Sequence, residues 1–552
     1  MEGYSHRVKQ QNGPEVLMKK LLSTLIFILV LSPMLLARSN RPLANANKAG
    51  LRVRSIEEVL RLREDEVDLA TAALIVSEQW SDMVYGREYL SRLDNMALEI
   101  RDRIESKRLR RQSSAIPEIN HYLFDELGFK SLSEAVDPNS LFLHNVMDEK
   151  CGYCLSLSIL YLSLAERLDL PLYGVVVPGH FFVRYDDGRT RFNIETTSNG
   201  STAPDEHYRK KFNVPQDNGN GIYLKNLNKT QTLGCLFNNL GNTYSDIGNT
   251  DSAMLALARA VDINPSLSES RSNLGNIYLK KGRIADAIRE YEMALQINPN
   301  DAKTHNNLGN AYTQRDWFNY AVTEYKESIR LDPNFTDAYK NLAITYCKQQ
   351  RYSQAISQLK QANALDPEDA GCYSQMGEVY SQMGNYEKAV SAYKQALRID
   401  PDLVDANYGL AICFNKLGMV IDEIWAYQKV LTLKPDMLAA LISLGNAYFG
   451  QEKYVAAIEQ YKKAVQIEPD EAMIYYNLGA AYSNSNNYEQ AVAAYLKAVE
   501  IDPTIGDAHY GLAFGFYQLK NYNLAWKHIK IAQELGVEVT EDQINSIKSR
   551  LQ

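Results

Sequence analysis

Four side chains in the first half of this 552-residue sequence could carry covalent chemistry: Cys151, Cys154, His180 and Glu195. A thiol, an imidazole and a carboxyl group are the parts of a catalytic triad, in which a base activates the nucleophile and an acid orients the base. We assign these three roles to Cys154, His180 and Glu195. Whether the fold brings them together depends on the elements that carry them.

The segment that follows Cys154 is predicted to be a buried helix. Leu157, Leu160 and Leu164 recur at helical spacing, and further leucines and isoleucine make the segment apolar almost all round. The helix must end before Pro171, because the residue preceding a proline is disfavoured in helical conformation. Cys154 then lies at the N-terminal end of the helix, where the helix dipole stabilises a thiolate.

The other two residues of the assigned triad, His180 and Glu195, lie in or beside short β-rich runs. Residues 172–177 and 181–185 read as strands, and Pro178-Gly179-His180 interrupts the pattern between them. Asp186-Asp187-Gly188 predicts a hairpin turn into a further strand over 191–196, which contains Glu195. A helix that opens on cysteine, a strand with histidine and a next strand with an acid therefore agree with the triad.

Four blocks of sequence resemble the bacterial transglutaminase-like core family, which is commonly fused to tetratricopeptide repeats. The blocks are Gly-Tyr-Cys-Leu-Ser-Leu-Ser, Tyr-Leu-Ser-Leu-Ala-Glu-Arg-Leu, Pro-Gly-His-Phe-Phe-Val-Arg-Tyr and Asn-Ile-Glu-Thr-Thr. The resemblance covers about residues 55–210. It implies a papain-like α+β fold and acyl transfer through a thioester, with Cys154, His180 and Glu195 in the matching positions. Glu195 stands where the superfamily usually has aspartate, and some members of the family lack the nucleophile.

Cys151 allows a different interpretation. Cys-x-x-Cys suggests a dithiol redox motif, but the βαβ context of thioredoxin-like proteins is missing from the surrounding sequence. A regulatory disulfide between Cys151 and Cys154 is the alternative in an oxidising compartment. The remaining cysteines are scattered singly through helical repeats and read as packing residues: Cys235, Cys347, Cys372 and Cys413.

The C-terminal half is periodic. Prolines recur every 34 residues from Pro265 to Pro503, and small residues and aromatics keep the same step. Small residues let two antiparallel helices approach, large ones fill the space beside them, and proline ends the second helix. This period resembles the tetratricopeptide repeat and predicts an all-α solenoid of nine repeats over 234–539. Thr540 and Gln543 form a capping box for a final helix over 540–552.

Asparagines recur on the first helix of several repeats. Side-chain amides both donate and accept hydrogen bonds, so a ladder of them could bind an extended peptide backbone in the concave face. The alternative is that they bond neighbouring helices. The candidate groove residues are Asn239, Asn242, Asn273, Asn276, Asn307, Asn310, Asn341, Asn446 and Asn477.

The N-terminal region has the pattern of a secretory signal peptide. Lys19 and Lys20 precede an apolar run over 21–36, and Ala37 or Ala44-Asn45-Ala46 offers a cleavage site. The true start could be Met18. We expect a signal peptide region over 1–37 and export to the periplasm or the cell exterior, with an uncleaved membrane anchor as the alternative. Linkers are expected over 38–52 and 214–233, on either side of a transglutaminase-like domain over 53–213.

Composition narrows the function further. The net charge of −8 argues against nucleic acid as a partner, because binding to phosphates needs clustered positive charge. The sequence contains no metal-ligand cluster, phosphate loop or dinucleotide fingerprint, so no cofactor is expected. The favoured interpretation is a cysteine-dependent hydrolase or acyl transferase whose repeats bind a protein or peptide. The alternatives are a non-catalytic interaction scaffold and a dithiol redox protein.

Overall fold

The computed structural model describes residue 43 and residues 52–81, 84–109, 112–133, 137–212, 214 and 222–551. The chain divides into two compact units, residues 1–311 and 312–552, which are taken separately below. The predicted signal peptide, Met18 and both candidate cleavage sites lie outside the described residues. Export therefore stays a prediction.

The first unit begins with helices that surround a buried one. Their order is α2 (Ile56–Val59), α3 (Leu69–Trp80), α4 (Gly86–Ser106), α5 (Ile116–Asn120), the π-helical η4 (His121–Glu126) and α6 (Leu143–Glu149). The short 3-10 segments η3 (Gln112–Ala115) and η5 (Pro138–Leu141) connect them. Asp68 begins α3 by accepting a hydrogen bond from the backbone N–H of Thr71. This cap and the buried apolar residues of the helix explain why α3 begins at Leu69.

Helix α7 (Cys154–Arg167) is the centre of this domain, and residues 155–165 are all buried. It packs against α3, α4 and β4. As predicted, it begins at Cys154 and ends ahead of Pro171.

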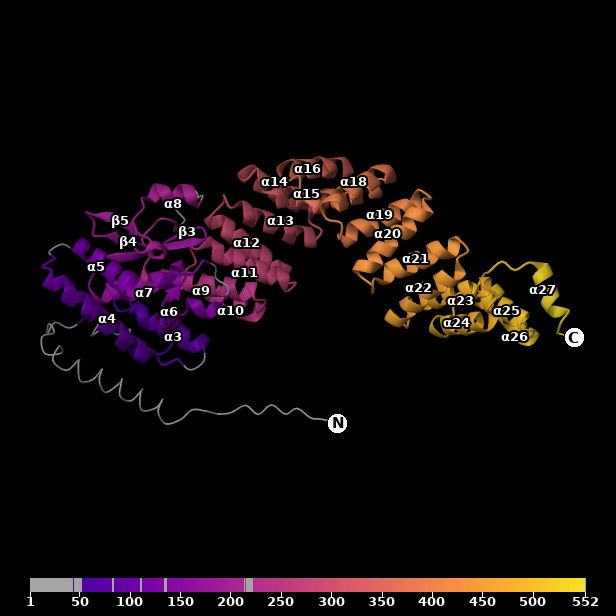
Figure 1. The fold of residues 1–552 in the computed structure, drawn as a ribbon, viewed down its shortest axis with the longest axis horizontal. Coiled ribbons are helices and arrows are strands. Elements are labelled where there is room, and N and C mark those ends of the chain that lie inside the picture. Colours follow the sequence, from indigo (N-terminus) through magenta and orange to yellow (C-terminus); the bar gives the residue numbers. More distant parts are fainter. Residues whose placement is uncertain are drawn as a thin grey trace, which may run out of the picture. The chain divides into compact units, whose positions relative to one another are not determined.

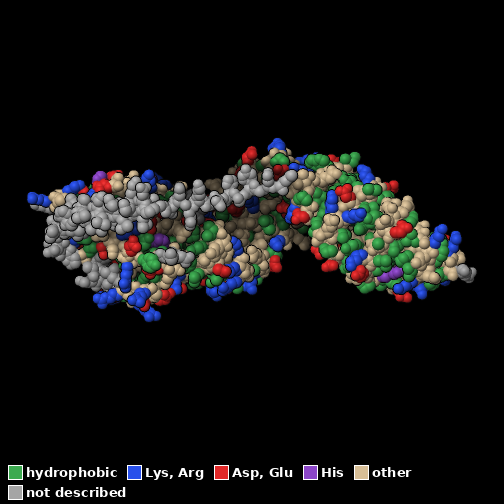
Figure 2. Space-filling view, turned by 60° about the horizontal axis from the view of Figure 1, so that its bottom comes forward, with side chains coloured by type: hydrophobic (Ala, Val, Ile, Leu, Met, Phe, Trp, Pro, Cys, Tyr) green, Lys and Arg blue, Asp and Glu red, His purple; other side chains and the backbone are tan. Residues whose placement is uncertain are grey.

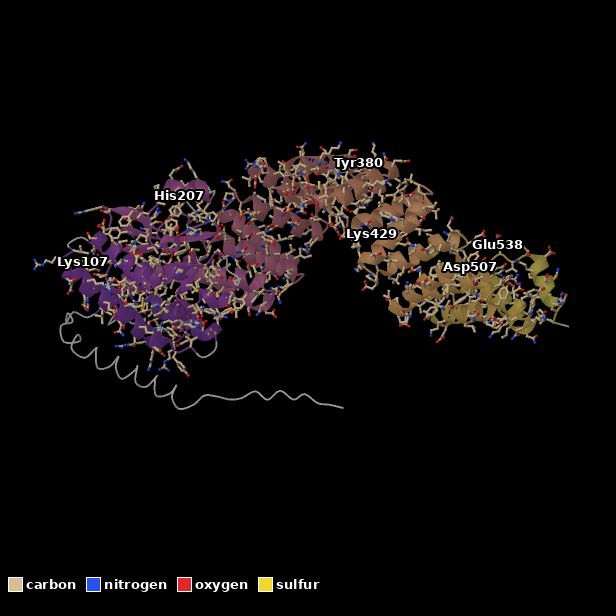
Figure 3. All side chains as sticks on the ribbon, viewed as in Figure 1. Lys107, His207, Tyr380, Lys429, Asp507 and Glu538 are labelled. Carbon is tan, nitrogen blue, oxygen red and sulfur yellow. The ribbon has the colours of Figure 1, made fainter. Side chains whose placement is uncertain are left out.

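Strands β3 (Leu172–Val177), β4 (His180–Asp186) and β5 (Arg191–Ile194) form an antiparallel sheet in the order β3-β4-β5. Two further short strands, β1 (Lys130–Ser131) and β2 (Cys151–Gly152), pair in parallel. Helix α8 (Asp205–Lys211) follows the sheet and lies beside it (Figure 1); His207 is labelled on it in Figure 3. The arrangement is the α+β fold expected from the sequence.

The first repeats belong to the same unit as this domain. They comprise α9 (Lys229–Asp246), α10 (Thr250–Ile263), α11 (Ser268–Lys280), α12 (Ile284–Ile297) and the start of α13 (Ala302–Gln314). Helix α9 begins inside the segment expected to be a linker, and its apolar residues join the core that also contains α3 and α7. Trp80 of α3 packs against the rings of Phe237 and Tyr244, with centroids 6.3 and 5.4 Å apart.

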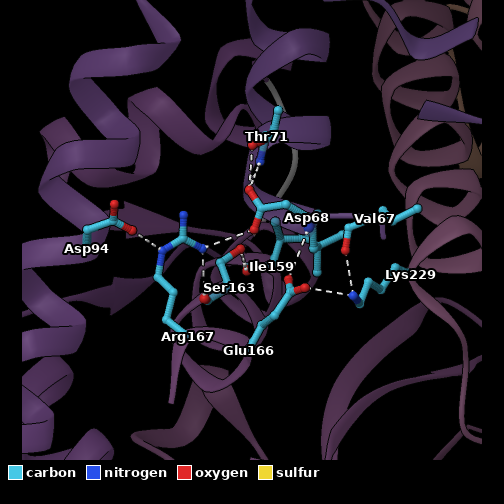
Figure 4. A network of polar contacts seen from close by, with 10 residues as sticks. Val67, Asp68, Thr71, Asp94, Ile159, Ser163, Glu166, Arg167 and Lys229 are labelled. Atoms are coloured by element: carbon cyan, nitrogen blue, oxygen red, sulfur yellow. Dashed lines mark hydrogen bonds and ion pairs between the residues drawn. The ribbon is translucent and has the colours of Figure 1, made fainter. Parts of the chain in front are cut away.

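A polar network fastens α9 to α7 (Figure 4). The ammonium of Lys229 donates to the carboxylate of Glu166 and to the carbonyl of Val67, both at 2.6 Å. The next residue of α7 is Arg167, whose fully buried guanidinium contacts the carboxylates of Asp68 and Asp94. Because Arg167, Asp68 and Glu166 are shielded from water, each needs its partner, and the bonds of Lys229 hold the first repeat against the domain.

The second unit continues the helical pairs. In order they are α14 (Phe318–Leu331), α15 (Thr336–Lys348), α16 (Tyr352–Leu365), α17 (Ala370–Gln382), α18 (Tyr386–Ile399), α19 (Val404–Lys416), α20 (Val420–Leu433), α21 (Leu438–Gly450), α22 (Tyr454–Ile467), α23 (Ala472–Asn484), α24 (Tyr488–Ile501), α25 (Gly506–Gln518) and α26 (Tyr522–Glu534). The final helix α27 (Glu541–Lys548) starts with the predicted capping box of Thr540 and Gln543. The described helices confirm the solenoid.

The repeated glycines have a steric cause. A Cβ atom on Gly377 would lie 2.7 Å from the ring of Tyr393, and one on Gly445 would lie 2.5 Å from the ring of Tyr461. Each tyrosine thus occupies the space that the missing side chain leaves free, which brings the two helices of a repeat together. This packing explains why small and large residues keep the 34-residue period.

Candidate active site

Cys154 is the first residue of α7, and its thiol is free. Gly152 allows the tight approach to the helix, since a Cβ atom there would lie 2.7 Å from Oγ of Ser156 and 3.0 Å from Val146. The first backbone N–H groups of an α-helix have no acceptor within the helix. At this position they can stabilise negative charge on a thiolate or on the oxygen of a carbonyl under attack.

His180 is the first residue of β4 and follows the turn at Pro178 and Gly179. Gly179 has a φ of +69°, a left-handed conformation that favours glycine. The imidazole stacks on the ring of Phe212, with centroids 4.8 Å apart and planes 5° apart. This contact limits the rotation of the ring and fixes the direction of its two nitrogen atoms.

Glu195 accepts a hydrogen bond from one of those nitrogens. Nε2 of His180 lies 2.7 Å from Oε2 of Glu195, and the two side chains are only 14% and 13% exposed. Thr197 donates its hydroxyl to Oε1 of Glu195 at 2.7 Å, and Tyr208 donates to Oε2 at 3.3 Å. With Nε2 engaged, Nδ1 of His180 is the nitrogen left for the thiol of Cys154, which also contacts the imidazole.

The predicted strand over 191–196 was two residues too long. Strand β5 ends at Ile194, and Glu195 is instead the N-cap of the 3-10 helix η6 (Thr196–Ser198). Its backbone N–H donates to the carbonyl of Ser201 at 2.8 Å, so the chain turns there instead of extending the sheet. The cap directs the carboxylate back over the end of the sheet toward His180.

The electrostatics fit an ion pair at this site. Burial alone would lower the pKa of His180, but hydrogen bonds and charges from Cys154 and Glu195 outweigh it and raise that pKa to about 9. Burial acts to raise the pKa of Glu195, and its contacts with His180 and Thr197 reverse this and hold the pKa below its usual range. An imidazolium held against a carboxylate at neutral pH is the charge state that favours a thiolate beside it.

Two hydroxyl groups that the sequence did not single out connect Cys154 to the segment that bears Glu195. Oγ of Ser158 donates to the backbone carbonyl of Cys154 at 2.6 Å and lies 3.0 Å from Oγ1 of Thr196. Thr196 follows Glu195 directly, and both hydroxyl-bearing residues are almost fully buried. Serine on an apolar helix is a weak sequence signal, and only the fold reveals its partner.

Cys151 lies in β2, three residues before the nucleophile, and its thiol is free. A regulatory or redox role for Cys151 stays a prediction. Cys235, Cys372 and Cys413 are buried, as their interpretation as packing residues expects, while Cys347 is half-buried. Burial raises the pKa of the Cys372 and Cys347 thiols to about 11, which disfavours their thiolates.

Several asparagines of the predicted ladder have partners inside the repeats. Nδ2 of Asn273 donates to Asn238 at 3.3 Å, and Nδ2 of Asn307 donates to Oδ1 of Asn276 at 2.9 Å. Oδ1 of Asn276 also accepts from Tyr291 at 2.7 Å, and in another repeat Oδ1 of Asn446 accepts from Tyr461 at 2.6 Å. For these positions the contacts favour the structural alternative over peptide binding.

Neither a metal site nor a membrane span is evident in the described part of the chain. It contains no group of three or more histidine, cysteine or acidic side chains placed to hold an ion. Within the same residues, every helix is too short or too polar to cross a bilayer. On the face drawn in Figure 2, lysine and arginine side chains are interspersed with aspartate and glutamate.

Comparison with protein families agrees with this architecture. Residues 87–229 match the model of the transglutaminase-like superfamily. Tetratricopeptide repeat models match residues 236–267, 445–486 and 472–505. The chain has a transglutaminase-like domain followed by tetratricopeptide repeats. Residues 254–411 also match the model of the cilia and flagella-associated protein 70 C-terminal domain.

Individual relatives cover parts of the chain. A UPF0162 protein of Xylella fastidiosa is 27% identical over 211 residues, which are 37% of this chain and 73% of that protein. F-box only protein 21 of Mus musculus is 36% identical over 78 residues, which are 14% of this chain and 12% of that protein.

Among solved structures, MamA is 28% identical and aligns over 29% of this chain and 95% of that chain, with a TM-score of 0.28. The C-terminal part of a tetratricopeptide repeat protein from Cytophaga hutchinsonii is 19% identical over 43% of this chain and 98% of that chain, with a TM-score of 0.38.

Proposed function

We propose that this protein is an exported cysteine-dependent hydrolase or acyl transferase whose repeats bind a protein or peptide substrate. The observation that supports it is the position of His180, whose imidazole contacts the thiol of Cys154 and lies 2.7 Å from the carboxylate of Glu195. Nucleophile, base and orienting acid are therefore neighbours in one site. The half-buried thiol at the start of α7 supports the nucleophile's role.

The chemistry starts from a thiolate and an imidazolium. Sγ of Cys154 attacks the carbonyl carbon of an amide or ester, and the carbonyl oxygen takes the negative charge beside the first N–H groups of α7. As the tetrahedral intermediate collapses, the bond to the leaving amine or alcohol breaks and His180 gives that group its proton. A thioester on Cys154 remains, with a neutral imidazole next to it.

The second half reverses these roles. His180 takes a proton from a water molecule or from an acceptor amine. The oxygen or nitrogen of that molecule attacks the thioester carbonyl. The bond to sulfur breaks, which returns the thiolate and the imidazolium and releases an acid or a new amide. Glu195 keeps Nε2 engaged throughout, so that Nδ1 stays directed at the reacting atoms.

The test is whether Cys154 becomes acylated. We expect p-nitrophenyl acetate to give a burst of nitrophenol and a mass increase of one acetyl group on Cys154 in the full chain. The Cys154→Ser and His180→Ala variants should lose the burst while keeping the same circular dichroism spectrum. Absence of acylation in folded wild-type protein would favour the scaffold alternative instead.

Export is tested separately. Lys19, Lys20 and the apolar run over 21–36 support a signal peptide. Mature protein is expected to begin after Ala37 or Ala46, which N-terminal sequencing would detect, whereas an intact N-terminus on protein from the cytoplasm would exclude export.

A further inference from the structure

Helix α8 is anchored to the sheet that carries the proposed base. The fully buried guanidinium of Arg184, on β4, donates to the carboxylate of Asp205 at the start of α8, at 2.5 Å. Asn193, on β5, donates to the same carboxylate oxygen at 2.8 Å and accepts from Arg184 at 2.7 Å. Because a buried charge needs its partner, these bonds fix where α8 begins relative to His180.

Aromatic rings hold the rest of the helix against the site. The ring of Tyr208 stacks on Phe182 of β4, with centroids 3.9 Å apart, and its hydroxyl donates to Glu195 at 3.3 Å. Phe212 is the C-cap of α8, and its ring lies parallel to the imidazole of His180, with centroids 4.8 Å apart. The last turn of α8 therefore lies beside the proposed base.

This last turn carries a positive charge. The ammonium of Lys211 lies over the ring of Phe212, 5.2 Å from its centroid. Since the same ring is 4.8 Å from the imidazole of His180, the charge can be no farther than about 10 Å from the imidazole. That is about the Debye length at 0.1 M salt, so a substrate bound beside His180 lies within the field of Lys211.

The acids at the start of α8 do not offset the charge of Lys211. Asp205 is engaged by Arg184, and Glu206 pairs with Lys210 at 3.8 Å. Among the described residues, no carboxylate lies within ion-pair distance of Lys211. Basic residues in the last turn of a helix also stabilise it through the helix dipole, and this is the alternative role that a test must separate.

The charges of the proposed triad make Lys211 significant for the substrate. A thiolate at Cys154 and a carboxylate at Glu195 exceed the imidazolium of His180 by one negative charge. Alone, this excess would repel an anionic substrate, and Lys211 offsets it. Arg209, in the same turn and also without an ion pair among the described residues, adds a second positive charge.

We propose that Lys211 is a specificity-determining residue that favours acidic peptides, with an aspartate or glutamate side chain beside the carbonyl under attack. The inference rests on the proposed function, because it names the substrate class of that same site. The anchored helix holds the charge in place, so the preference depends on the residue at position 211.

The experiment compares two reagents that alkylate Cys154 in the full chain at pH 7: iodoacetate, which is an anion, and its neutral analogue iodoacetamide. Both react with the same thiolate, so the ratio of the two rates reports the potential at the site instead of the fraction of thiolate. Lys211→Gln should lower the ratio of iodoacetate to iodoacetamide about twofold and Lys211→Glu about fourfold, as one and two charge units about 10 Å away in water predict.

The controls separate charge from helix stability. Lys211→Arg keeps the charge and should keep the wild-type ratio. Lys107→Gln removes an equal charge from the end of α4, where Lys107 pairs with Glu118, and should also leave the ratio unchanged. Salt at about 1 M should bring the wild-type ratio close to that of Lys211→Gln. Equal ratios in wild type, Lys211→Gln and Lys211→Glu would overturn the proposal.

Substrate preference is measured with two esters, the mono-p-nitrophenyl ester of succinic acid, which is an anion, and p-nitrophenyl acetate. The ratio of their acylation rates should be about twofold higher in wild type than in Lys211→Gln. Acylation by both esters with the same ratio in the two proteins refutes the inference alone. Absence of acylation by either ester refutes the proposed function, and the inference with it.

Discussion

The hydroxyl oxygens of Ser158 and Thr196 lie 3.0 Å apart, and both side chains are buried. Ser158 also donates to the carbonyl of Cys154, and Thr196 follows Glu195 in the chain. Helix α7 and the segment that bears Glu195 are therefore joined by buried contacts, to which Thr196 adds a hydrogen bond of 3.4 Å to the carbonyl of Cys154. We infer that these contacts hold the proposed triad together without taking part in its proposed reaction.

Removing the hydroxyl of Thr196 should loosen the triad. Thr196→Val has nearly the same volume but leaves Ser158 without its neighbour, at a cost of about 1 kcal/mol of stability. The alkylation rate of Cys154 should fall, though less than in His180→Ala. Thr196→Ser keeps the hydroxyl and should retain the wild-type rate; equal rates for the Val and Ser variants would show that the contact is irrelevant to the site.

The ion pair of His180 and Glu195 should increase the free energy of unfolding only within a limited range of pH. The raised pKa of His180 contributes stability that is complete below pH 6.5 and lost as the pH rises through about 9. The lowered pKa of Glu195 contributes stability that is present above pH 4.5 and lost as the pH falls further. Because Cys154 supplies part of the rise in the pKa of His180, the excess stability of wild type over Glu195→Gln should be greatest between these limits and on the order of 1 kcal/mol.

Calorimetric unfolding of both proteins across this range measures the window. Glu206→Gln provides the control, since Glu206 is an exposed acid on α8 whose side chain is 65% exposed. It should show no such window. A stability difference between wild type and Glu195→Gln that does not change from pH 5 to pH 9 would contradict the ion pair.

The asparagine contacts predict stability effects within the repeats. Asn307→Ala removes the donor to Oδ1 of Asn276, which keeps its bond from Tyr291. We expect a loss of about 1 kcal/mol, measured by thermal unfolding, and a similar loss for Asn273→Ala. Unchanged melting temperatures together with weaker binding of a peptide partner would instead restore the ladder interpretation.

The contact between Lys229 and Glu166 should matter more than a surface pair. The side chains are 24% and 9% exposed, so Lys229→Met leaves a nearly buried carboxylate without its cation, at a cost of about 2 kcal/mol. Adding Glu166→Gln removes that charge and should recover part of the loss. A double variant that is no more stable than Lys229→Met alone would mean that the charge is not the cause.

Local sequence patterns predicted most of the fold. The 34-residue period gave the repeat helices because close packing of glycine against tyrosine tolerates few substitutions, as Gly377 and Tyr393 illustrate. Helix α7 could be placed because its apolar residues cover every face and because Pro171 limits its end. The capping box at Thr540 depends only on residues close in the sequence, so it could be predicted as well.

Contacts between distant segments escaped prediction. Glu269 looks like an ordinary solvated residue of a repeat, and its hydrogen bond from Tyr223, 46 residues earlier in the chain, follows only from the fold. The same applies to Lys229, which begins α9 inside a stretch that reads as a linker. Glu195 does contact His180, but it was placed on a strand, since nothing in the local sequence indicates that its side chain caps η6.

The measurement that tests the account most directly is the alkylation of Cys154 by iodoacetamide as a function of pH. An imidazolium at His180 stabilises the thiolate, so Cys154 should already react rapidly at pH 6 and faster than every other cysteine of the folded chain. His180→Ala should remove this advantage, and Cys151→Ser should preserve it under reducing conditions. A Cys154 that instead reacts slowly at pH 6, gains rate like a free thiol near pH 8.5 and is indifferent to His180 would contradict the catalytic account.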